Sequence, residues 1–173
     1  MRILFFLLIG LFINSQHAAA QDTSAFGRPA YELKVAVDKE SFYSQDIKAG
    51  PYVLPDNTIQ LYPGETVYVE IEQENGVIKK MQAVPQIRDA AKTITISFTQ
   101  DVKGKVHSMM MLKVTNPFVQ QLVYKVSIYL YSQKKWVSTD VWPVEPGVAG
   151  IETWQDIIIS VGLGDWTLQK NPS

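Results

Sequence analysis

The sequence predicts an all-β protein, an antiparallel β-sandwich of immunoglobulin-like architecture with about seven to nine strands. Several segments alternate apolar and polar residues with a period of two, which is typical of half-buried strands. Turn-forming residues separate these segments at spacings near those of a sandwich, at positions 51, 55–57, 63–64, 75–76, 104 and 146–147. A closed barrel is the alternative architecture.

The first 20 residues predict a signal peptide that is cleaved on export. Arg2 supplies the positive charge, residues 3–13 form an apolar run, and the alanines at 18–20 provide a small-residue cleavage site. This run is shorter than the roughly 20 residues of a membrane-spanning helix, so cleavage is favoured over a retained anchor. We therefore expect an exported protein, periplasmic or extracellular, with no membrane span after cleavage.

The rest of the chain predicts one domain. Residues 21–30 are small and polar and suggest a flexible leader, residues 31–168 form the predicted β-sandwich domain, and residues 169–173 form a tail. The chain contains no cysteine, so no disulfide can brace the fold. A domain of this length can bury a sufficient core without one.

The earliest strands are predicted at 31–37, 67–72 and 93–99, each with β-branched or aromatic residues at alternate positions. The turn at 75–76 then closes a hairpin with the second of these strands. A plain two-residue turn would set Val69 opposite a polar residue, so the core-facing side of the hairpin would mix apolar and polar side chains. A one-residue bulge instead sets Val69 opposite Met81 or Ala83 and brings acidic residues close to the lysines after the turn.

A further hairpin is predicted between residues 122–131 and 136–142, closed by a turn at 132–135. A symmetric turn gives a register that segregates apolar from polar side chains. The inward pairs are Leu130 with Val137, Ile128 with Thr139, and Val126 with Val141. The outward pairs are Tyr131 with Trp136, Tyr129 with Ser138, Ser127 with Asp140, and Lys125 with Trp142.

The apolar strand at 106–114 contains a histidine and three consecutive methionines. In a regular strand His107, Met109 and Met111 share one face, and thioethers select Cu(I). The competing interpretation is that the methionines fill gaps in the core. We favour that interpretation and predict neither a metal nor another cofactor.

Composition excludes several kinds of chemistry. With no cysteine and only His107 after the signal peptide, neither a cysteine–histidine nucleophile nor a zinc site of nitrogen and sulfur ligands can be assembled. The chain has 16 basic and 17 acidic residues, and cleavage removes only Arg2 from this count, which leaves a net charge of about −2. Without a basic stripe, a nucleic-acid partner is not expected.

Carboxylates supply only a weak enzymatic hypothesis. Asp140 and Glu145 flank Trp142. Most glycoside hydrolases use a pair of carboxyl groups as their catalytic residues. Such an enzyme also needs an apolar pocket that keeps one of them protonated. Solvated surface acids are the simpler interpretation, so we predict that the protein is not an enzyme.

The aromatic set of the second predicted hairpin is the strongest functional lead. Its register places Tyr129, Tyr131, Trp136 and Trp142 on the outward face, with Lys125 beside Trp142 for a cation–π contact. Exposed together, these rings would form a patch of the kind that marks binding sites. The alternative is that an extra strand, or residues 157–163, covers this face and creates a second small core.

The sequence therefore favours a non-enzymatic exported binding or assembly module that engages a protein partner. It would use the aromatic face or an exposed strand edge, to which a partner adds a strand. A carbohydrate-binding module is the alternative, and a two-carboxylate hydrolase is the weakest interpretation.

Overall fold

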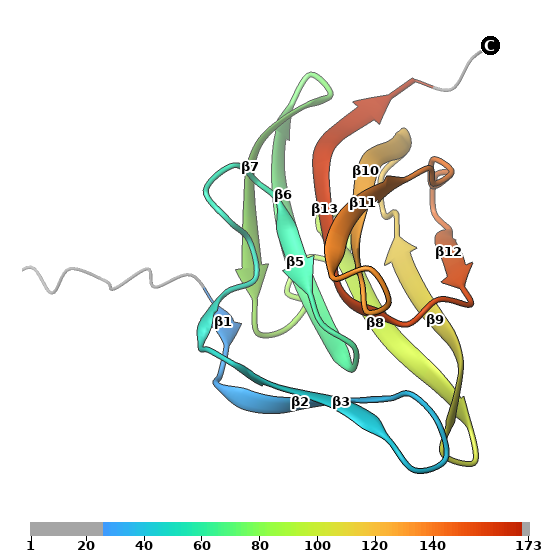
Figure 1. Cartoon of the computed structure of the whole chain (residues 1–173). Coiled ribbons are helices and arrows are strands. Elements are labelled where there is room, and N and C mark those ends of the chain that lie inside the picture. Colours follow the sequence, from blue (N-terminus) through green and yellow to red (C-terminus); the bar gives the residue numbers. More distant parts are fainter. Residues whose placement is uncertain (1–25, 171–173) are drawn as a thin grey trace, which may run out of the picture.

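The computed structural model describes residues 26–170 and contains strands but no helix among them. Two antiparallel sheets pack against each other, which confirms the predicted antiparallel β-sandwich (Figure 1). The immunoglobulin-like arrangement of strands stays a prediction. The predicted signal peptide, residues 21–25 of the predicted leader and residues 171–173 lie outside the described residues.

One sheet has five strands and the other has four. The five-stranded sheet has the order β12-β9-β8-β6-β7, made of Ala149–Trp154, Val106–Thr115, Thr93–Lys103, Glu65–Glu74 and Val77–Val84. The four-stranded sheet has the order β11-β10-β13-β5, made of Lys135–Thr139, Gln121–Leu130, Ile158–Gln169 and Ile59–Leu61.

The core lies between these two sheets. Alternate residues of every long strand point into it, among them the predicted positions Val67, Val69 and Ile71 of β6 and Ile94, Ile96 and Phe98 of β8. Burial of this apolar surface is the main favourable contribution to folding. Because the inner faces are filled, any binding surface must lie on an outer face, an edge or an end of the sandwich.

The hairpin of β6 and β7 confirms the predicted bulge. Val69 lies opposite Ala83, and the register shifts by one residue between Glu72 and Gln73. The shift also brings acidic and basic side chains together as expected. Glu74 and Glu72 form ion pairs with Lys79 and Lys80, at 3.8 and 3.5 Å.

The hairpin of β10 and β11 has the predicted faces but a different register. Leu130 pairs with Lys135, Ile128 with Val137, Val126 with Thr139, Tyr129 with Trp136, and Ser127 with Ser138. The predicted pairs were wrong by two residues, because the turn occupies 131–134 and not 132–135. Lys134 adopts a left-handed backbone with φ of 51°, and its amide donates to the Leu130 carbonyl. A two-residue slip preserves the face of every side chain.

A separate N-terminal hairpin of β2 (Tyr31–Ala36) and β3 (Phe42–Ile47) lies across one end of the sandwich (Figure 1). Ahead of it, the two-residue strand β1 (Gly27–Arg28) pairs with β4 (Gly50–Pro51). Arg28 is buried and ion-paired to Glu65. Residues 27–28, which were predicted to belong to the flexible leader, are thus part of the domain.

Candidate functional site

The predicted aromatic face is divided into a covered half and an open half. Tyr129 and Tyr131 pack against a second apolar cluster formed between the N-terminal hairpin and β13, whose buried members are Leu33, Val35, Ile47 and Ile159. The ring of Tyr131 contacts Tyr43 of β3 edge to face, with centroids 5.7 Å apart. For these two tyrosines the alternative prediction holds, because an extra pair of strands turns them into a small core.

A bulge in β13 makes this covering possible. The register between β10 and β13 shifts after Tyr129, so that Ile158 points into the main core while Ile159 points into the second cluster. Both isoleucines are buried. Adjacent residues of one strand thus serve two separate cores.

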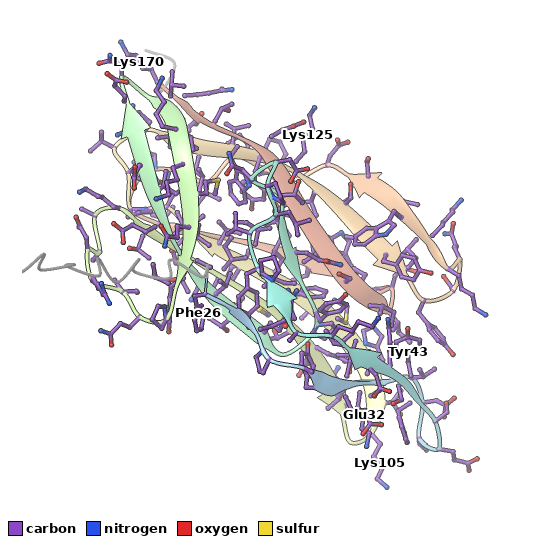
Figure 2. The ribbon with its side chains drawn as sticks, turned by 90° about the vertical axis from the view of Figure 1, so that its left-hand side faces the viewer. Phe26, Glu32, Tyr43, Lys105, Lys125 and Lys170 are labelled. Carbon is purple, nitrogen blue, oxygen red and sulfur yellow. The ribbon has the colours of Figure 1, made fainter. Side chains whose placement is uncertain are left out.

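Trp136 belongs to the open half. Its side chain is 46% exposed and meets the edge of the Tyr129 ring at a centroid separation of 5.5 Å. In Figure 2, Lys125 lies well away from Tyr43, which belongs to the covering hairpin.

A groove with a volume of about 690 Å³ runs over this open half. It is lined by residues of β5, β10, β11 and β13, and by residues just before β5 and just after β11. The polar side chains in its lining are Thr58, Gln60, Lys125, Ser127, Ser138, Thr139, Asp140 and Asp165. The groove therefore combines one large aromatic ring with many hydroxyl groups and three charged groups.

The floor of the groove is low because β13 contributes glycine at two alternate positions. Gly162 and Gly164 lie opposite Ser127 and Lys125 of β10. A Cβ atom at Gly162 would lie 3.9 Å from Cζ3 of Trp136. Because Trp136 belongs to β11, two strands away from β13, its ring reaches across β10 and lies beside the glycine floor.

One end of the groove carries the ion pair of Lys125 and Asp165. The ammonium nitrogen lies 2.8 Å from Oδ2 of Asp165. Hydrogen bonding to this carboxylate, followed by its negative charge, raises the pKa of Lys125 above its ordinary value. The carboxylate therefore stabilises the charged form of Lys125.

Lys125 does not pair with Trp142 as predicted. Strand β11 ends at Thr139, so Trp142 never reaches the position opposite Lys125. Its side chain is 82% exposed, it does not line the groove, and its backbone amide donates to Oε1 of Glu152 at 3.0 Å. Of the five predicted binding residues, Trp136 and Lys125 line the groove and the other three do not.

The histidine and methionines of β9 do not share a face, so the geometry behind the copper hypothesis was wrong. Met109 pairs with Asp101 and His107 with Val102, which leaves Ser108 as the extra residue of a bulge. The bulge turns His107 away from the face of Met109 and Met111. Its Nδ1 and Nε2 atoms lie 2.9 Å from Gln100 Nε2 and from the Gln155 carbonyl.

The two carboxylates considered for hydrolysis are not brought together in the groove. Asp140 lines it, whereas Glu145 does not and accepts a hydrogen bond from the side chain of Gln121. Gly162 and Gly164, which form the floor of the groove, are among the lining residues that the sequence analysis did not predict. Alternate glycines in the run Gly162-Leu163-Gly164 were the available signal, since glycine in a strand often marks a site of close approach.

Comparisons with known proteins give no match. No protein-family model, no curated protein and no solved structure matches this chain. Among residues 26–170 there is no helix with the length and apolar character needed to cross a membrane. The same residues contain no group of three or more His, Asp or Glu side chains arranged to hold a metal ion.

Proposed function

We propose that the protein is an exported, non-enzymatic binding module that holds a neutral glycan in the groove of the four-stranded sheet. The observation that carries this proposal is the position of Trp136, half exposed beside a floor of glycine. A pyranose ring has apolar C–H faces and a rim of hydroxyl groups. An indole ring offers a rigid apolar surface for such a face, and the glycines leave room for it.

The polar lining supports a ligand rich in hydroxyl groups. Ser127, Ser138 and Thr58 can each donate and accept hydrogen bonds. A small number of placed polar groups around an apolar surface is the usual composition of a ligand site. The groove therefore offers an apolar surface for the C–H faces of a sugar and hydroxyl groups that can bond to the sugar hydroxyls.

Charge supports a neutral ligand over an anionic one. The charged residues of the lining are Lys125, Asp140 and Asp165, and the single lysine is already paired with Asp165. Phosphates and acidic sugars are usually held by clusters of Arg and Lys. With two carboxylates against one ammonium, this groove would repel such groups.

Binding is a better account of the groove than hydrolysis. The carboxylate of Asp165 contacts an ammonium group, and its side chain is 67% exposed. Asp140 is also exposed. A hydrolase needs one carboxylic acid kept protonated by an apolar environment, and neither residue has one.

The experiment is a titration of intrinsic tryptophan fluorescence with a panel of neutral hexose and pentose oligosaccharides. We expect at least one of them to change the emission of the wild-type protein, and we expect Trp136→Ala to abolish binding measured by calorimetry. Trp142→Ala is the matched control, because Trp142 is exposed but lies outside the groove. Gly162→Val should also prevent binding by raising the floor. The proposal fails if no oligosaccharide binds, or if Trp136→Ala binds as well as Trp142→Ala.

A protein partner is the second candidate, favoured by Trp142 and by the free edge of β11. Among residues 26–170 this strand pairs only with β10, and Trp142, just beyond it, is largely exposed. An extended partner segment would add a strand at this edge. Cross-linking of the exported protein in its native compartment tests this idea, and Trp142→Ala, which spares glycan binding, should weaken the cross-link.

A further inference from the structure

Asp165 adopts a backbone conformation that is uncommon within a strand. Its φ angle is 53°, in the left-handed region, although it lies within strand β13. Glycine is the residue that adopts this region without steric cost. The chain thus places a carboxylate where the backbone geometry favours glycine.

A β-bulge produces this conformation. Val123 pairs with Thr167 and Lys125 with Gly164, so two residues of β13, Asp165 and Trp166, lie opposite one residue of β10. Bulges of this kind redirect side chains and are frequent beside functional sites. Here the bulge sets the directions of the side chains of Asp165 and Trp166.

The inward member of the bulge is fixed in the core. Trp166 is buried and stacks on Tyr124, with ring centroids 4.8 Å apart. Its indole Nε1 donates to the carbonyl of Leu163 at 3.2 Å. Asp165 is held on the outer side, in the lining of the groove, with its carboxylate against Lys125.

The ion pair alone does not account for the strained position. The side chains of Lys125 and Asp165 are 81% and 67% exposed, and pairs as exposed as this contribute little to stability. Residues whose backbone strain is not offset by a stabilising contact are concentrated at ligand-binding and catalytic sites. The observation therefore points to a function for Asp165 in the groove.

We infer that Lys125 and Asp165 together form the charged subsite of the proposed glycan site, and that they bind two neighbouring ring hydroxyls of the sugar. This inference rests on the proposed function. The ammonium group donates to one hydroxyl oxygen and the carboxylate accepts the proton of the next hydroxyl. Their own separation of 2.8 Å suits two neighbouring ring hydroxyls, whose oxygens stand at hydrogen-bonding distance from each other.

The test compares Asp165→Gly, Asp165→Asn and Lys125→Met with the wild-type protein, using the oligosaccharide of the panel that binds most tightly. We expect Asp165→Gly to weaken binding by about tenfold or more, the effect of losing one hydrogen bond to a charged group. Asp165→Asn should have an intermediate effect, because a neutral acceptor remains. The midpoint of thermal unfolding should stay unchanged or rise in Asp165→Gly, since glycine relieves the backbone strain.

Glu145→Gln, outside the groove, is the control and should bind like the wild-type protein. The inference is overturned if both Asp165 variants bind within about twofold of wild type while Trp136→Ala has lost binding, and in that case the glycan site itself stands. The proposed function fails separately if no oligosaccharide binds the wild-type protein, and the inference then falls with it.

Discussion

Arg28 and Glu65 form a buried, two-point ion pair that fastens the start of the domain to the main sandwich. Nε and Nη2 of Arg28 donate to the two carboxylate oxygens of Glu65, at 2.8 and 3.2 Å. The guanidinium group also lies over the rings of Tyr52 and Tyr62, 4.7 and 5.1 Å from their centroids. The planar, always-charged guanidinium suits this combination of bidentate and stacking contacts.

Glu65→Ala should therefore destabilise the protein strongly. It removes the partner of a buried charge and also the acceptor of the Tyr31 hydroxyl and of the Tyr62 amide. Breaking a buried pair in this way costs about 3–5 kcal/mol of unfolding free energy, measurable by urea denaturation. The control is Glu72→Ala, which breaks the exposed pair with Lys80 and should cost about 0–1 kcal/mol. Similar losses in the two variants would contradict the assigned role of Arg28 and Glu65.

Stability should decline at alkaline pH because of Tyr31. Burial raises the pKa of its hydroxyl, and the negative charge of Glu65 raises it further. The unfolded chain loses this proton near pH 10, about the ordinary value for tyrosine, while the folded chain retains it to higher pH. The contribution of Tyr31 is thus complete below about pH 10 and is lost as pH rises toward the folded pKa.

The measurement is the unfolding free energy in urea from neutral pH to about pH 11, for wild type and Tyr31→Phe. We expect a shallower alkaline decline in Tyr31→Phe, because phenylalanine has no proton to lose. Burial also raises the pKa of Tyr124, so Tyr124→Phe should reduce the remaining decline. Parallel curves for wild type and Tyr31→Phe would rule out this origin of the pH dependence.

Local alternation was enough to predict the faces of the strands, and turn chemistry was enough for one hairpin. Val69 and Ile71 had to face the core, and only a bulge near the 75–76 turn allowed this, which left Met81 or Ala83 as the partner of Val69. The observed partner is Ala83. The register of β10 and β11 did not follow, since it depends on Lys134 adopting a left-handed backbone. Nothing in a lysine signals this, whereas the Asn-Gly pair at 75–76 did signal a turn.

The binding groove was predicted only in part, because its shape depends on contacts between distant segments. Trp136 could be placed on the outer face from the hairpin pattern alone. The docking position of the N-terminal hairpin decides that Tyr129 is covered and Trp136 is exposed. This hairpin could in principle dock on any outer surface of the sandwich. Likewise, the bulges at Ser108 and Asp165 are insertions relative to a neighbouring strand. The sequence of one strand does not show how many residues its neighbour uses over the same length, so these bulges could not be predicted.

Gly150 of β12 should not tolerate a side chain. A Cβ atom there would lie 2.7 Å from Cγ2 of Val144, which is buried and pairs with Leu122. Gly150→Ala should cost about 1–3 kcal/mol of unfolding free energy through overpacking. Gly50→Ala is the matched control, because a Cβ atom at Gly50 would meet no heavy atom within 4 Å. Equal midpoints of thermal unfolding in the two variants would show that Val144 can move aside.

Gln100 of β8 should hold the N-terminal hairpin in place, because its side-chain amide bonds to both the N–H and the C=O of Ala36. Its Oε1 accepts from the amide of Ala36 and its Nε2 donates to the Ala36 carbonyl, each at 2.8 Å. These two bonds fix the orientation of the Gln100 amide, so its second N–H faces Nδ1 of His107 as an acceptor. The proton of the imidazole then lies on Nε2, directed at the Gln155 carbonyl.

Gln100→Leu keeps a similar volume but leaves the N–H and C=O of Ala36 unpaired at a half-buried position, and each such group costs about 1–3 kcal/mol. We expect faster hydrogen exchange at the Ala36 amide, by about tenfold or more, and a smaller loss of protection across β2, where pairing with β3 remains. The exposed Gln133, in the turn between β10 and β11, provides the control as Gln133→Leu. Unchanged exchange at Ala36 would mean that apolar packing of Leu33 and Val35 alone holds the hairpin, because their burial against Ile159 is untouched by the substitution.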